Sequence, residues 1–136
     1  MNILVVDDNP PDVVLIRESL RERGLTYKLT HCADGEQALG VLNRSNPHTF
    51  DIMILDLNMP KLGGLEVLGK IRSTSRLREL PVLVLTSSLV PGEQEEAMRL
   101  GAHRFLRKPS DLDQFLLVVG AAVRDLVVDE HAANPA

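Results

Sequence analysis

Aromatic residues and cysteine are scarce in this sequence of 136 residues. It has no tryptophan, a single tyrosine and a single cysteine, Cys32, so no disulfide can form within the chain. So few aromatic rings argue against base stacking on nucleic acid, and the net charge of −4 provides no basic surface for it.

Long apolar runs and a basic leader are also missing. No run approaches the roughly 20 apolar residues that span a bilayer, and the first residues lack the positive charges of a signal peptide. A lone cysteine fits a reducing compartment. These features predict a cytoplasmic protein that contacts neither membrane nor nucleic acid.

Apolar runs alternate with helical segments along the chain. ILVV at 3–6 and IMIL at 52–55 are apolar without alternation, which is typical of strands covered on both faces. The predicted strands span residues 2–6, 26–32, 50–56, 80–86 and 103–107. The predicted helices span residues 11–23, 35–42, 65–73, 91–100 and 110–129.

This alternation predicts an α/β fold in one domain over residues 1–129, followed by a flexible tail over 130–136. Strands joined through helices form a parallel, doubly wound sheet with right-handed crossovers. The length suits a flavodoxin-like sheet of five strands in the order 2-1-3-4-5 with five helices. That order gathers the ends of strands one, three, four and five around one crevice.

Charged and hydroxyl side chains stand where these four strands end. Asp7 and Asp8 follow the first strand, Asp56 ends the third, Thr86 closes the fourth and Lys108 follows the fifth. Three crowded carboxylates repel one another unless a cation joins them, and Mg²⁺ suits oxygen ligands. Phosphoryl transfer requires a nucleophile, a metal ion and donors to the phosphoryl oxygens. We therefore predict that Asp56 accepts a phosphoryl group; the alternative is a charge-balanced network at the strand ends.

The order and spacing of its motifs make the sequence resemble the receiver domain of two-component response regulators over essentially its whole length. The resemblance rests on VVDD at 5–8, DLNMP at 56–60 with Gly64 beyond it, Thr86-Ser87 after an apolar strand, and Lys108-Pro109 after Phe105. Because the fifth helix is the last predicted element, the resemblance is to single-domain regulators without an output domain. NPPD at 9–12 is similar to the subgroup that serves phytochrome-like sensor kinases.

The resemblance implies a role for each matching residue. Asp56 would take the phosphoryl group from a phosphohistidine of a sensor histidine kinase, Thr86 would donate a hydrogen bond to that group, and Lys108 would pair with it. Asp8 would bind a Mg²⁺ ion, or Mn²⁺ in its place, directly, and Asp7 would bind it directly or through water. The Asp56 side chain and the backbone carbonyl of Asn58 would be further ligands.

The resemblance also implies conformational features near the fifth strand. The Lys108–Pro109 peptide bond would be cis, which the small trans preference before proline allows. Phe105 would be the switch aromatic that moves with Thr86 on phosphorylation. Many receivers have tyrosine there; because phenylalanine lacks the hydroxyl, an inward ring is expected even before phosphorylation.

Two other functions share parts of this pattern. An aspartate-nucleophile phosphatase of the haloacid dehalogenase type has a second Asp two residues after the nucleophile, but here that residue is Asn58. A receiver-like module that binds partners without phosphorylation would not need the acidic pair or Lys108. The prediction is therefore a phosphoacceptor and not an enzyme.

The last predicted helix has more apolar residues than one buried face requires. The stripe expected to cover the sheet comprises Leu112, Phe115, Leu116, Val119, Ala122, Val123 and Leu126. Leu117, Val118, Ala121 and Val128 fall largely on the other side, and clustered exposed apolar residues usually mark an interface. With Arg104 and the acids of the fourth helix as charge partners, they predict a homodimer through the fourth helix, the fifth strand and the fifth helix.

Overall fold

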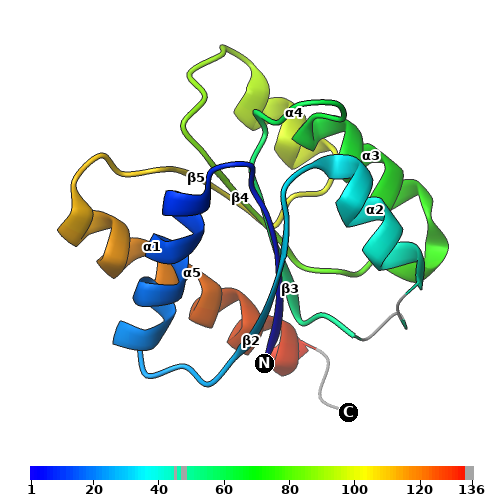
Figure 1. Cartoon of the computed structure of the whole chain (residues 1–136). Coiled ribbons are helices and arrows are strands. Elements are labelled where there is room, and N and C mark those ends of the chain that lie inside the picture. Colours follow the sequence, from blue (N-terminus) through cyan, green and yellow to red (C-terminus); the bar gives the residue numbers. More distant parts are fainter. Residues whose placement is uncertain (45, 47–48, 134–136) are drawn as a thin grey trace.

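The apolar runs form one five-stranded parallel sheet in the computed structural model of the chain, which describes residues 1–44, 46 and 49–133 (Figure 1). The strands are β1 (Asn2–Val6), β2 (Lys28–Cys32), β3 (Ile52–Leu55), β4 (Val82–Thr86) and β5 (Arg104–Arg107). Their order is β2-β1-β3-β4-β5 and each pairing is parallel, which confirms the predicted flavodoxin-like topology.

Helices cover both faces of the sheet. They are α1 (Pro10–Glu22), α2 (Gly35–Arg44), α3 (Gly64–Ser73), α4 (Glu93–Arg99) and α5 (Leu112–Ala133). In Figure 1, α1 and α5 lie on one side of the sheet and α2, α3 and α4 on the other. A 3₁₀ turn, η1 (Ser75–Leu77), follows α3 and was not predicted from the sequence.

The strands contribute side chains to two cores, which explains their unbroken apolar runs. In β1, Leu4 and Val6 belong to the core under α2, α3 and α4, whereas Ile3 and Val5 belong to the core under α1 and α5. All of these side chains are fully buried. Successive residues of a strand point to opposite faces, so covering both faces requires an apolar residue at each position.

Side-chain caps fix where the first two helices begin. The Asn9 side chain accepts a hydrogen bond from the Asp12 N–H (3.4 Å) at the start of α1. At α2, Asp34 Oδ1 accepts from the Gln37 N–H (2.9 Å), and the Gln37 side chain accepts from the Ala33 N–H (2.9 Å). This reciprocal pair closely resembles a capping box, as the spacing of Asp34 and Gln37 predicts.

The last helix differs from the prediction at both ends. It continues to Ala133, so it takes up much of the segment predicted to be a flexible tail, and residues 134–136 lie outside the described part. Alanine and glutamate are strong helix formers, which favours this extension. Leu112, predicted to face the sheet, opens the helix and is 53% exposed, whereas Phe115 is buried. Within the described ranges, none of the helices has the length and apolar character of a membrane span.

Helices α1 and α5 are joined by polar contacts inside a mostly apolar seam. The buried Ser19 hydroxyl donates to the Leu116 carbonyl (2.6 Å) and accepts from the Gly120 N–H (2.6 Å). A Cβ added at Gly120 would lie 2.5 Å from the Ser19 carbonyl oxygen. Only glycine therefore allows the two helices to approach this closely.

Replacing Gly120 with alanine is expected to destabilise the protein by about 1–3 kcal/mol, the usual cost of overpacking a core. In an open helix interior the same change is favourable by up to about 1 kcal/mol. Gly69 of α3 offers that control, because nothing lies within 4 Å of a Cβ built there. Urea unfolding should show a loss for Gly120→Ala and none for Gly69→Ala, and equal stability of the two variants would contradict the close seam.

Candidate functional site

The sheet positions the predicted site residues by extending its hydrogen bonds past the strand ends. The Asp7 N–H donates to the carbonyl that ends β2 (3.0 Å), and the Asp56 N–H donates to the Val6 carbonyl (2.9 Å). The Lys108 N–H donates to the Thr86 carbonyl (2.9 Å). The structure therefore brings the predicted residues at the ends of β1, β3, β4 and β5 to one edge of the sheet.

The Lys108 ammonium lies among three carboxylates. Its Nζ atom is 2.9 Å from Asp7 Oδ2, 2.8 Å from Asp12 Oδ2 and 3.0 Å from Asp56 Oδ2. The side chains of Lys108, Asp7 and Asp56 are 7%, 3% and 6% exposed, so these charges are largely removed from water. A buried charge is tolerated when it is paired and hydrogen-bonded, and here one cation serves several anions.

Asp12 is a site residue that the pattern of strand ends does not reveal. In the sequence it belongs only to the NPPD segment at 9–12. In the structure it lies in the first turn of α1, which Asn9 caps directly after Asp7 and Asp8. A helix that starts immediately after a strand presents its first turn to the same edge of the sheet, and this was the signal that could have identified Asp12.

Asp7, Asp8 and Asp56 form a cluster that can hold a metal ion. One carboxylate oxygen from each lies within 4.8 Å of the others, with Asp8 exposed and the other two buried. Asp7 Oδ1 accepts from the Asn9 N–H (2.9 Å), and Asp56 Oδ1 accepts from the Asn58 N–H (3.2 Å). An all-oxygen set of this kind suits Mg²⁺ or Mn²⁺ and does not suit zinc.

Burial and ion pairing have opposite effects on the site's ionisable groups. Burial raises the pKa of Asp7, against the hydrogen bonds from Lys108 and the Asn9 N–H, which lower it. Burial alone would lower the pKa of Lys108, but hydrogen bonds to Asp12 and Asp7 and the nearby negative charges raise this pKa above its ordinary value. Lys108 is therefore charged at neutral pH. Its contribution to stability is fully present below the ordinary pKa of lysine and is lost as the pH rises from there through the raised folded-state pKa.

Thr86 and Phe105, predicted as switch residues, lie on the neighbouring strands β4 and β5. Thr86 is fully buried, and its Oγ1 atom accepts from the Ser88 N–H (3.1 Å), which leaves the hydroxyl proton as a donor. Phe105 is partly buried, with the Arg107 guanidinium 5.6 Å from its ring centre. Arg107 also donates to the Ser88 carbonyl and so links the loop after β4 to the ring. The inward state of Phe105 stays a prediction.

The peptide bond between Lys108 and Pro109 is trans, so the predicted cis bond is wrong. No peptide bond in the described part of the chain is cis. Trans is the preferred form before proline, and local sequence alone does not decide between the two forms. Lys108 reaches its three carboxylates from the trans form.

Relatives in sequence are response regulators. The chain is 36% identical over 136 residues to the response regulator MprA of Mycobacterium avium, and equally identical to MprA of Mycobacterium leprae. Each alignment covers 100% of this chain and 57% of the relative. The chain therefore spans little more than half the length of the curated relatives it matches.

Solved structures of response regulators share the fold. The phosphorylated cyanobacterial phytochrome response regulator RcpA matches with a TM-score of 0.82 at 29% identity, over 99% of this chain and 95% of RcpA. The Mn²⁺-bound form of the response regulator Rcp1 matches with a TM-score of 0.80 at 29% identity, over 88% of this chain and 89% of Rcp1. Residues 3–119 match the family described as the response regulator receiver domain. The chain therefore belongs to the receiver domain family of two-component response regulators.

Proposed function

We propose that this receiver domain accepts a phosphoryl group on Asp56 from a sensor histidine kinase. Receiver domains are phosphoacceptor signalling modules that bind Mg²⁺ at an acidic pocket, and the cluster of Asp7, Asp8 and Asp56 fits such a pocket. The observation that carries the proposal is the position of Asp56, which belongs to this cluster while its Oδ2 atom lies 3.0 Å from Lys108 Nζ.

The proposed reaction moves a phosphoryl group between two side chains. A carboxylate oxygen of Asp56 attacks the phosphorus of a phosphohistidine in line with the P–N bond. The P–O bond forms as the P–N bond breaks, and the leaving imidazole keeps the electron pair and takes up a proton. Lys108 would donate to a phosphoryl oxygen as charge arrives there. Mg²⁺ would neutralise phosphoryl oxygens, and Asp7, Asp8, Asp56 and the Asn58 carbonyl would hold it.

Acetyl phosphate with Mg²⁺ should form a single adduct on Asp56, detected by intact-mass and peptide mass spectrometry, and EDTA should prevent it. Asp56→Asn should form none, yet keep the fold with equal or higher stability in EDTA, because it removes one of three repelling carboxylates. Asp51→Asn, at the opposite end of β3, is the matched control and should still be modified. An adduct on residue 56 of the Asn variant would show that the acceptor is misassigned.

The two other functions give different outcomes in the same experiment. An aspartate-nucleophile phosphatase would hydrolyse its substrate with repeated turnover, but Asn58 supplies an N–H to Asp56 where that class has its acid/base carboxylate. A module that acts without phosphorylation would form no adduct. Turnover would favour the phosphatase, and a wild type without an adduct would favour constitutive binding.

Phosphorylation would reach partners through Thr86 and Phe105. The Thr86 hydroxyl would turn its proton toward a phosphoryl oxygen, and Arg107 would pass the movement on, because it contacts both the Ser88 carbonyl and the Phe105 ring. Thr86→Ala should still be phosphorylated but should lose the change in Phe105 ring resonances that NMR detects in the wild type. The same change in both proteins would refute the coupling.

The proposed phosphoryl donor is a phytochrome-like kinase acting in the cytoplasm. Support comes from the NPPD segment at 9–12 and from the similarity to RcpA, a phytochrome response regulator. Phosphotransfer profiling against the sensor kinases of the host should give the fastest transfer from a kinase of this class. Faster transfer from a sensor kinase of another class would show that a phytochrome-like kinase is not the donor.

A homodimer through α4, β5 and α5 is also proposed, on the basis of exposed apolar side chains. Leu117 is 53% exposed, and Val118 and Ala121 are partly exposed. Arg104 lies 4.0 Å from Asp125 of its own chain, so it does not need an acid from a second copy. The apolar residues, not the predicted charge pairs, therefore support the interface.

Leu117→Glu combined with Ala121→Glu should give a folded monomer in analytical ultracentrifugation, while the wild type sediments as a dimer. Glutamate side chains at an apolar interface would have to lose their hydration when the dimer forms, which is unfavourable. Val14→Glu is the matched control, because this valine is 57% exposed on α1, and it should remain dimeric. A wild type that is monomeric with and without phosphorylation would rule out the dimer. The exposed apolar side chains would then be assigned to contact with the kinase.

A further inference from the structure

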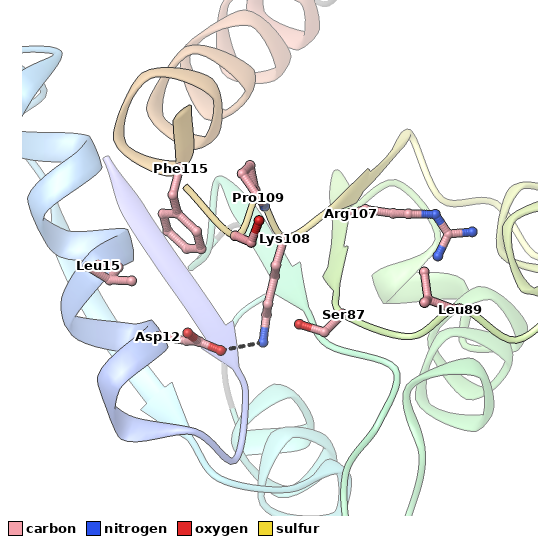
Figure 2. Close-up of a pocket in the computed structure, with 9 residues that line it drawn as sticks. Asp12, Leu15, Ser87, Leu89, Arg107, Lys108, Pro109 and Phe115 are labelled. Atoms are coloured by element: carbon pink, nitrogen blue, oxygen red, sulfur yellow. Dashed lines mark hydrogen bonds and ion pairs between the residues drawn. The ribbon is translucent and has the colours of Figure 1, made fainter. Parts of the chain in front are cut away.

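Asp12 contacts Lys108 from outside the acidic cluster. Its Oδ2 atom lies 2.8 Å from Lys108 Nζ, and its side chain is 20% exposed against 7% for Lys108. Figure 2 shows the two side chains pointing toward each other. Together with Ser87 they line an open cavity of about 500 Å³. We propose that Asp12 is a positioning residue that holds Lys108 in place during phosphoryl transfer to Asp56.

The reason lies in what happens to Asp7 and Asp56, the other two carboxylates that contact Lys108. A lysine ammonium has three N–H donors, and here each can be matched to one carboxylate oxygen. Asp7 and Asp56 belong to the cluster that fits a metal ion, and Asp56 also becomes the acyl phosphate. A cation in the cluster would draw their oxygens away from Lys108. Asp12 lies outside the cluster, so its contact with Lys108 is the one that persists.

The fold holds Asp12 where this contact requires it. Its N–H is bound by the Asn9 side chain (3.4 Å) in the first turn of α1, and Ser19 fixes the same helix against α5. Arg107, which also lines the cavity, is engaged by the loop after β4. Of the two cationic side chains that line the cavity, Lys108 is therefore the one that Asp12 binds.

A purely structural role for Asp12 leads to a different expectation. An acid in the first turn stabilises a helix through the macrodipole, whatever cation stands opposite it. Substituting Asp12 would then have the same effect whether or not residue 108 carries an amine. A double-mutant cycle with Lys108→Gln distinguishes the two roles.

The experiment compares the wild type with Asp12→Asn, Asp12→Glu, Lys108→Gln and the double variant. Mg²⁺ affinity is measured by NMR titration, and adduct formation on Asp56 by mass spectrometry with acetyl phosphate. Asp12→Asn should reduce both the Mg²⁺ affinity and the rate of adduct formation by about tenfold, the usual effect of losing a charged hydrogen bond. Lys108 would then be neutralised by the metal-binding carboxylates alone and would compete with Mg²⁺.

Two variants serve as controls, Asp12→Glu from this set and Glu22→Gln in addition to it. Asp12→Glu should recover part of the loss, because the carboxylate is restored on a longer side chain. Glu22→Gln makes the same charge change at the exposed end of α1 and should change neither quantity.

In the Lys108→Gln background, adding Asp12→Asn should change Mg²⁺ affinity by less than about twofold, because no amine remains to be held. An equal loss in both backgrounds, or no loss in either, would overturn the positioning role. The inference rests on the proposed function, and the two can fail separately. A wild type without an adduct would refute the phosphoryl-acceptor function, whereas a normal wild-type adduct with an unaffected Asp12→Asn variant would refute only the role of Asp12.

Discussion

The Lys108 ammonium is the group on which the rest of the site depends. It is nearly buried and joins carboxylates from separate elements, with Asp7 after β1, Asp12 in α1 and Asp56 after β3. Negative charges this close together can be buried only when a positive charge stands among them. Lys108 therefore offsets negative charge at the edge of the sheet where the strands end. Some of the oxygens that it contacts are ones that a metal ion would also bind.

Because the same oxygens can bind either Lys108 or a metal ion, the contacts of Lys108 can change when the metal site is filled. Asp7 and Asp56 contact Lys108 and also belong to the acidic cluster, so occupation of the cluster would loosen the hold on the lysine. The same edge continues into the loop after β4, where Ser88 contacts both Thr86 and Arg107. Under the proposed function, phosphorylation of Asp56 would alter the conformation of β5 through these packed and hydrogen-bonded groups.

The sheet and most of the site could be predicted because both depend on local patterns. Unbroken apolar runs identify the central strands, and the residue that follows each run lies at the edge by topology alone. Asp12 could not be found in this way, because its contact with Lys108 depends on the distance between α1 and the residue after β5, far apart in the chain. The trans bond before Pro109 was missed because the local sequence is compatible with either form. The extension of α5 to Ala133 was missed because the small and polar composition of the last residues was weighed above the helix propensity of alanine and glutamate.

The stability of Lys108→Gln with and without Mg²⁺ tests most directly whether Lys108 balances the carboxylates of the site. At neutral pH in EDTA, the variant should unfold at a lower urea concentration than the wild type, because Asp7, Asp12 and Asp56 are left without their cation. Saturating Mg²⁺ should restore much of the loss, since the ion supplies positive charge to the same oxygens. A variant as stable as the wild type in EDTA, or a loss that Mg²⁺ does not reduce, would contradict this role.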